Sequence, residues 1–150
     1  MAVVLLSFSI NSCKQTSGVD QQYRTITLHV DTGSINQQNI DSTANFGQKG
    51  LSNKDFITFV ELEDNIEWRG LSSTSPREDI VKIKKIKWKN GAKILNALEL
   101  KGQTSVVGKV KKGKPGNVGE YLIEFTVFNN GIKRDDFTID PKLEVIVKNR

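Results

Sequence analysis

The segment "IVKIKKIKWK", residues 80–89, alternates aliphatic residues with lysines. This period of two is typical of a strand with one buried and one exposed face. The alternation slips once: Val81 and Ile83 share one face, whereas Ile86 reaches that face only after a shift of one residue. A bulge inserts one extra residue into a strand, so the slip predicts a β-bulge near Lys84–Lys85.

The same alternation recurs along the chain. It is clearest in "YRTITLHVD" (23–31) and in the long segment "EYLIEFTVF" (120–128). Between such segments lie clusters of Gly, Asn, Asp and Pro, the residues that favour turns. Asn-Gly at 90–91 is the strongest hairpin signal, and Asn-Asn-Gly at 129–131 predicts another turn. Of all the segments, only "AKILNALEL" (92–100) resembles a short helix.

About nine short strands separated by turn signals predict an all-β fold. We expect a single antiparallel β-sandwich of about eight or nine strands over residues 23–150, with immunoglobulin-like or cupredoxin-like packing. The chain has 150 residues, enough to bury a hydrophobic core without disulfides or metals. Its last third, "EYLIEFTVFNNGIKRDDFTIDPKLEVIV" (120–147), resembles the closing hairpins of small exported bacterial β-sandwich proteins.

The N-terminal segment "MAVVLLSFSINSC" is mostly apolar and carries no charge before Cys13, which is the only cysteine. It resembles the lipobox of bacterial lipoproteins, with an aliphatic residue, Ile10, three positions before the cysteine and a small residue, Ser12, directly before it. The resemblance implies that residues 1–12 are a signal peptide lacking its own start, and that the Cys13 thiol carries a lipid. Residues 13–22 then form a lipidated tether, and the protein is anchored in the bacterial cell envelope.

Asp31-Thr32-Gly33 resembles the catalytic loop of aspartic proteases. Those enzymes need two such loops, because two carboxylates share one proton. The chain has one copy, so only a dimeric protease using Asp31 remains as an alternative. We instead expect a turn that ends the first strand, with Ile26, Leu28 and Val30 pointing inward.

Other catalytic chemistry has few candidates. His29 is the single histidine, whereas zinc and copper sites use several His or Cys ligands. The sequence therefore predicts no metal, no cofactor and no enzymatic activity. Trp68 and Trp88 share the alternation of their neighbours, so we expect both in the core. If aromatic side chains were exposed instead, they would indicate a carbohydrate-binding module.

Lysines dominate the centre of a chain whose formal net charge is +5. Residues 82–114 contain eleven lysines and one acidic residue, Glu99. We expect a subset of them to form a surface for an anionic partner: Lys82, Lys87, Lys89, Lys109, Lys111, Lys112 and Lys114. A purely protective role is the alternative, because lysines on edge strands discourage pairing between sheets.

The sequence thus indicates a non-catalytic, lipid-anchored envelope protein that acts as a binding or structural module. Its expected partners are a membrane, through the N-terminal lipid, and an anionic glycan, lipid or protein. A nucleic-acid partner is not expected, because bidentate phosphate recognition favours arginine over lysine.

Overall fold

The computed structural model describes residues 23–147. The expected signal peptide, Cys13 and the tether lie outside the described residues. Within them, no helix is long and apolar enough to cross a bilayer.

Ten strands and two short helical turns make up the described chain. They are β1 (Tyr23–Val30), α1 (Ile40–Thr43), β2 (Ala44–Asn45), the 3-10 turn η1 (Asn53–Asp55), β3 (Ile57–Val60), β4 (Asn65–Ser72), β5 (Ile80–Gly91), β6 (Glu99–Lys101), β7 (Ser105–Lys109), β8 (Val118–Asn129), β9 (Ile132–Ile139) and β10 (Lys142–Val145). The prediction of an all-β sandwich is confirmed.

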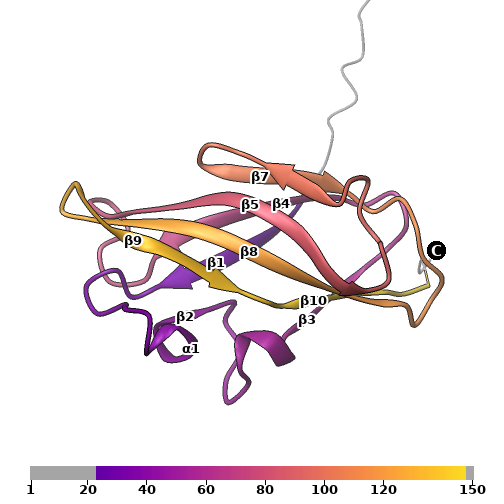
Figure 1. The fold of residues 1–150 in the computed structure, drawn as a ribbon, viewed down its shortest axis with the longest axis horizontal. Coiled ribbons are helices and arrows are strands. Elements are labelled where there is room, and N and C mark those ends of the chain that lie inside the picture. The colour runs from indigo at the N-terminus through magenta and orange to yellow at the C-terminus, as the bar shows by residue number, and fades with distance from the viewer. Residues whose placement is uncertain (1–22, 148–150) are drawn as a thin grey trace, which may run out of the picture.

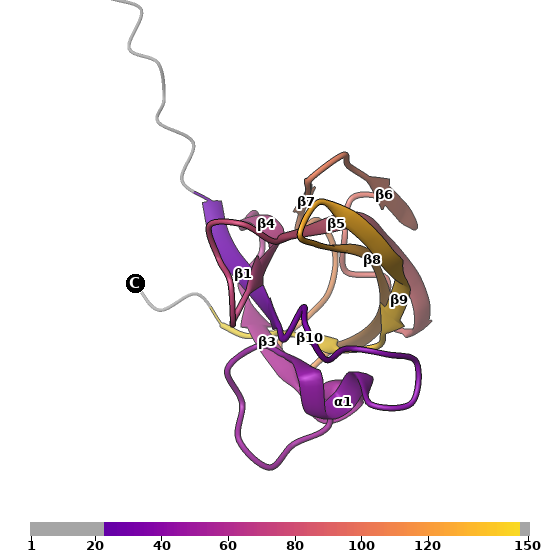
Figure 2. The ribbon, with the colours of Figure 1, turned by 90° about the vertical axis from the view of Figure 1, so that its left-hand side faces the viewer.

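The strands form two facing sheets (Figures 1 and 2). The smaller sheet has the order β2-β1-β4-β7, and the larger has the order β3-β10-β8-β5-β6, with β9 also paired to β8. Most neighbours are antiparallel, as expected. The pairs β1–β4 and β3–β10 are parallel, so both sheets are mixed.

The core lies between the sheets and follows the alternation read from the sequence. Ile26, Leu28 and Val30 of β1 are buried, as predicted. On the larger sheet, Phe125 of β8 is fully buried and stacks on Phe137 of β9, with ring centroids 5.5 Å apart. These side chains keep the two sheets together because burial of apolar surface is the main favourable term in folding.

The predicted bulge in β5 is confirmed. Ile83 pairs with Phe125 and Lys85 pairs with Glu124, so Lys84 is an extra residue without a position of its own in the ladder. The insertion keeps Ile83 and Ile86 on the buried face.

One local prediction was wrong. Asn90–Gly91 forms no hairpin turn but continues β5, where Gly91 pairs with Gly119. The 12-residue strand β8 is long enough to go on pairing there. A second register shift lies between Trp88 and Asn90, and Gly91 has a positive φ of 72°. Residues 92–100 form no helix, because Leu95 bridges Val110 and Glu99 starts β6.

The predicted turn at 129–131 is confirmed. Asn130 and Gly131 both have positive φ, 49° and 76°, and Asn129 pairs with Ile132 across them. This is the two-residue hairpin geometry that Asn-Gly favours.

Candidate functional site

A groove on the outer face of the larger sheet is a basic concave surface of the described chain. It has a volume of about 540 Å³ and is lined by Lys82, Lys84, Lys85, Lys101, Gly102, Glu124, Phe125, Thr126, Phe128, Lys133 and Asp136. We call it the lysine groove. Five lysines face two carboxylates in it, so its formal charge is positive.

The groove exists because side chains of one parity from four neighbouring strands share a face. Lys82 is opposite Thr126, and Lys85 is opposite Glu124 on β8 and Lys101 on β6. On the other side of β8, Asp136 of β9 is opposite Thr126. The bulge adds Lys84 to the same surface.

Three of the groove lysines are neutralised by neighbours. Lys85 forms an ion pair of 2.9 Å with Glu124, and this contact raises the pKa of the Lys85 ammonium. Lys133 forms an ion pair with Asp136, which lowers the pKa of that carboxyl together with a hydrogen bond from the Thr126 hydroxyl. Lys101 pairs with Glu99.

Lys82 and Lys84 differ from the other three. Neither forms an ion pair with any residue of the described range 23–147. The Lys82 ammonium lies 4.8 Å from the centroid of the Phe128 ring, a cation–π contact that positions the charge without cancelling it. The groove therefore offers an anion two ammonium groups that form no ion pair, although the Lys84 charge also acts on the Asp136 carboxylate of the same groove.

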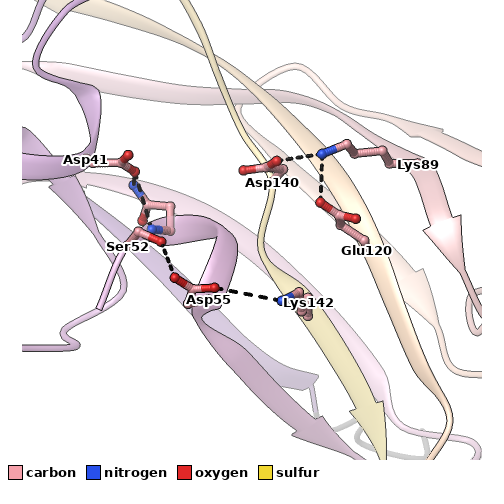
Figure 3. Close-up of polar contacts among 8 residues, drawn as sticks. Asp41, Ser52, Asp55, Lys89, Glu120, Asp140 and Lys142 are labelled. Atoms are coloured by element: carbon pink, nitrogen blue, oxygen red, sulfur yellow. Dashed lines mark hydrogen bonds and ion pairs between the residues drawn. The ribbon is translucent and has the colours of Figure 1, made fainter. Parts of the chain in front are cut away.

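Of the seven lysines expected from the sequence, three lie on β5. Lys82 lines the groove, and Lys87 is exposed on the same strand opposite Glu99. Lys89 lies between two carboxylates, 2.7 Å from Glu120 and 2.6 Å from Asp140 (Figure 3). These contacts raise its pKa, with Asp140 the larger cause, and they occupy its charge.

The other four lie in and after β7 of the smaller sheet. Lys109 and Lys111 both contact Glu63, at 2.8 Å and 3.1 Å, and the hydrogen bonds lower the pKa of that carboxyl. Lys112 and Lys114 follow in the loop to β8 and form no ion pair within residues 23–147. The sequence missed Lys84, Lys85, Lys101 and Lys133 as groove residues. Lys85 and Lys133 are opposite residues of β8, whereas Lys101 is opposite Lys85 of β5 and Lys84 is the bulge residue, so the predicted bulge was the signal available for Lys84.

The Asp-Thr-Gly segment is a structural corner. The Asp31 carboxylate accepts hydrogen bonds from the backbone N–H and the hydroxyl of Ser34, which is how aspartate stabilises a turn. Thr32 is fully buried, and its hydroxyl donates to Asp79 and lies 2.8 Å from the Ser72 hydroxyl. These residues close one end of the sandwich.

The single histidine and the two tryptophans lie on β1, β4 and β5. His29 is half-buried on β1, and no three His, Cys, Asp or Glu side chains of residues 23–147 are grouped as a metal site requires. Trp68 is in the core, as predicted, with 3% exposure. Trp88 is half-buried against the core, and the Lys93 ammonium lies 4.9 Å from its ring.

Comparison with known proteins gives a structural likeness alone. No family model and no curated protein matches the chain. A solved structure of PixA, an inclusion body protein from Burkholderia cenocepacia J2315, is similar with a TM-score of 0.56 and 12% sequence identity, covering 85% of this chain and 98% of that one. At this identity the likeness shows a shared fold.

Proposed function

We propose that the protein is a non-catalytic, lipid-anchored protein of the bacterial cell envelope that binds an acidic polymer in the lysine groove. The observation that carries this proposal is the presence of two unpaired lysines, Lys82 and Lys84, in one concave surface. Unpaired ammonium groups that share a groove attract anions and raise their local concentration.

The chemistry of the groove favours a polymer with spaced carboxylates or sulfates. Lysine presents a compact point charge, whereas planar bidentate recognition of a phosphate favours arginine. The groove is open along the sheet and contains the partly exposed Phe128 ring, so an extended chain with apolar faces, such as an acidic glycan, matches it in shape and charge.

The anchor part of the proposal is supported by the residues before the described domain. "INSC" (10–13) resembles a lipobox, and the polar residues 14–22 separate it from β1. Mass spectrometry of the protein from a bacterial membrane fraction tests this directly: the mature chain is expected to begin at Cys13 with a lipid on its thiol. An unmodified Cys13 would remove the anchor.

The non-catalytic part rests on the use of Asp31. Its carboxylate oxygens are hydrogen-bonded within its own turn, to Ser34. If Asp31 were instead half of a dimeric protease site, Asp31→Asn would abolish a proteolytic activity of the wild-type protein. We expect neither protein to cleave casein.

Binding to polygalacturonate, with neutral dextran as the reference polymer, tests the groove. We expect Lys82→Gln combined with Lys84→Gln to weaken binding about tenfold or more, because a hydrogen bond to a charged group contributes about 1.5 kcal/mol. Lys49→Gln combined with Lys54→Gln is the matched control, since both lysines are exposed and lie outside the groove. Equal binding of polygalacturonate by the two double variants would refute binding in the groove.

A further inference from the structure

Several strands begin or end together at one pole of the sandwich, on the right in Figure 1. Tyr23, the first described residue, pairs with Asn65 at the start of β4, and Asn65 pairs with Lys109 at the end of β7. We call this surface the N-terminal pole: Tyr23, the turn 61–64, the loop 110–117 and Val147.

Backbone hydrogen bonds hold these pieces side by side. The Glu63 N–H donates to the Val110 carbonyl, which joins the turn to the loop. The Gly116 N–H donates to the Val145 carbonyl, which joins the loop to the end of β10. The pole is therefore a continuous surface built from segments distant in sequence.

The loop 110–117 presents lysines in a fixed conformation. Asn117 N–H donates to the Lys114 carbonyl across Pro115 and Gly116, and Gly116 has a φ of 85°. Proline followed by a glycine with positive φ is a type II turn. Lys112 and Lys114 are exposed on this loop, and neither forms an ion pair with a residue of the part of the chain that the structure describes.

Large apolar side chains are exposed beside these lysines. Leu62, in the turn, is 44% exposed, and Val147 is 64% exposed. Phe59, just before the turn, is 52% exposed, and its carbonyl accepts a hydrogen bond from Arg24. Exposed apolar groups mixed with lysines are characteristic of surfaces that lie on lipid head groups.

We propose that the N-terminal pole docks on the surface of a bilayer rich in anionic lipids. The inference rests on the proposed lipid anchor for its geometry. Tyr23 follows Cys13 by ten residues, which span at most about 35 Å. The tether joins the domain at this pole, so anchoring keeps Lys112 and Lys114 within its reach of the head groups, where each lysine contributes about 1 kcal/mol of attraction. Of the carboxylates in the turn 61–64, Glu63 is paired with Lys109 and Lys111, and Asp64 is paired with Arg24. Glu61 is the acidic side chain of this turn that opposes the attraction.

Docking at this pole orients the lysine groove. Val118 begins β8 at the pole and Phe128, ten residues later, lines the groove. A strand rises about 3.3 Å per residue, so roughly 33 Å separate the two positions. The groove thus extends away from the docked surface, and its Phe128 end lies clear of the head groups.

The test is an amine-labelling footprint of the full lipidated protein, read by mass spectrometry. The protein is reconstituted in vesicles of phosphatidylcholine alone or with about a third phosphatidylglycerol. We expect labelling of Lys112 and Lys114 to slow about fivefold or more in the anionic vesicles, as one lysine's attraction implies. Labelling of Lys49 and Lys54, outside the pole, is expected to be equal in both, and roughly 0.5 M salt is expected to remove the difference.

A variant sharpens the footprint. Lys112→Gln combined with Lys114→Gln is expected to lose the slower labelling of Lys111 in anionic vesicles. Equal labelling of Lys112 and Lys114 in the two vesicle types would overturn docking, and equal slowing at Lys49 and Lys54 would overturn its assignment to this pole.

The same spectra separate this inference from the proposed function. A lipidated Cys13 with unchanged footprints leaves the anchor standing and ends the docking proposal. If Cys13 carries no lipid, the anchor fails, and footprints of the full chain with Cys13→Ser added to the same vesicles decide docking alone. Polygalacturonate binding reports on the groove in either case.

Discussion

The Asp79 carboxylate accepts a hydrogen bond from the backbone N–H of Asn130, with 2.8 Å between oxygen and nitrogen. Asp79 precedes β5, and Asn130 forms the β8–β9 turn. The same carboxylate accepts hydrogen bonds from the Asn129 side chain and from Thr32, which follows β1. One buried carboxylate therefore connects the two sheets at the pole opposite the N-terminus.

This connection predicts a sensitive position at Thr32. Thr32→Val keeps the shape of the side chain but removes the hydroxyl, so the buried partners lose a donor. We expect the free energy of unfolding in urea to fall by about 1–3 kcal/mol. Thr25→Val, at an exposed site of β1, is the control and should change little; similar losses in both variants would contradict the role of the hydroxyl.

Stability is also expected to fall in acid. The Thr32 hydroxyl, followed by the Asn130 N–H, lowers the pKa of Asp79, and Lys133 followed by Thr126 lowers that of Asp136. A carboxyl with a lowered folded-state pKa stabilises the fold fully above its unfolded pKa of about 3.9, and the contribution is lost as pH falls through the folded value.

Urea denaturation at several pH values between about 7 and 2 measures this dependence. Asp79→Asn removes one titrating group, so its stability is expected to vary less with acid than that of the wild type. A variant that keeps the full wild-type dependence would show that Asp79 does not contribute.

A close approach of backbones predicts a strict glycine. A Cβ on Gly70 would lie 2.7 Å from the Val81 carbonyl oxygen and would overlap the Val81 side chain. Backbone atoms cannot swing aside, so we expect Gly70→Ala to cost about 1–3 kcal/mol. Gly33→Ala has room, with Asp31 Oδ1 at 3.6 Å, and thermal unfolding of both variants should separate them clearly.

Trp88 provides the opposite case. Its indole nitrogen is buried and has no hydrogen-bond partner among residues 23–147. Trp88→Phe removes this unpaired donor and keeps an aromatic ring beneath Lys93, so we expect stability within about 1 kcal/mol of the wild type. Trp88→Ala should cost clearly more, about 2–4 kcal/mol, because it leaves a cavity. If Trp88→Phe cost as much as Trp88→Ala, the indole N–H would have to form a stabilising hydrogen bond, which would contradict this prediction.

Strands could be predicted from the sequence where one face is buried and the other is exposed, because apolar and polar residues then alternate. Alternation identified β1, β5 and β8, and its one slip identified the bulge at Lys84. Alternation does not specify the partner of a strand, so the parallel pairing of β1 with β4 could not be read from it. The turn signal at Asn90–Gly91 was overruled because pairing with β8 continues there.

The candidate site was predictable only in part for the same reason. The excess of lysine was visible, and parity placed Lys82 on the outer face. Which lysines keep a free charge depends on partners brought by the fold, such as Glu63 for Lys109 and Glu124 for Lys85. These carboxylates lie on other strands or turns.

At the bulge residue Lys84, the fold requires that a residue be present but does not require a particular side chain. Deleting that residue would turn either Val81 and Ile83 or Ile86 toward water, because a shift of one position exchanges the two faces of a strand. Replacing it with another residue leaves the frame intact, since its side chain is exposed and outside the ladder. Evolution can therefore change the charge at this position of the groove, and with it the preferred ligand, but it cannot remove the residue without turning core side chains outward.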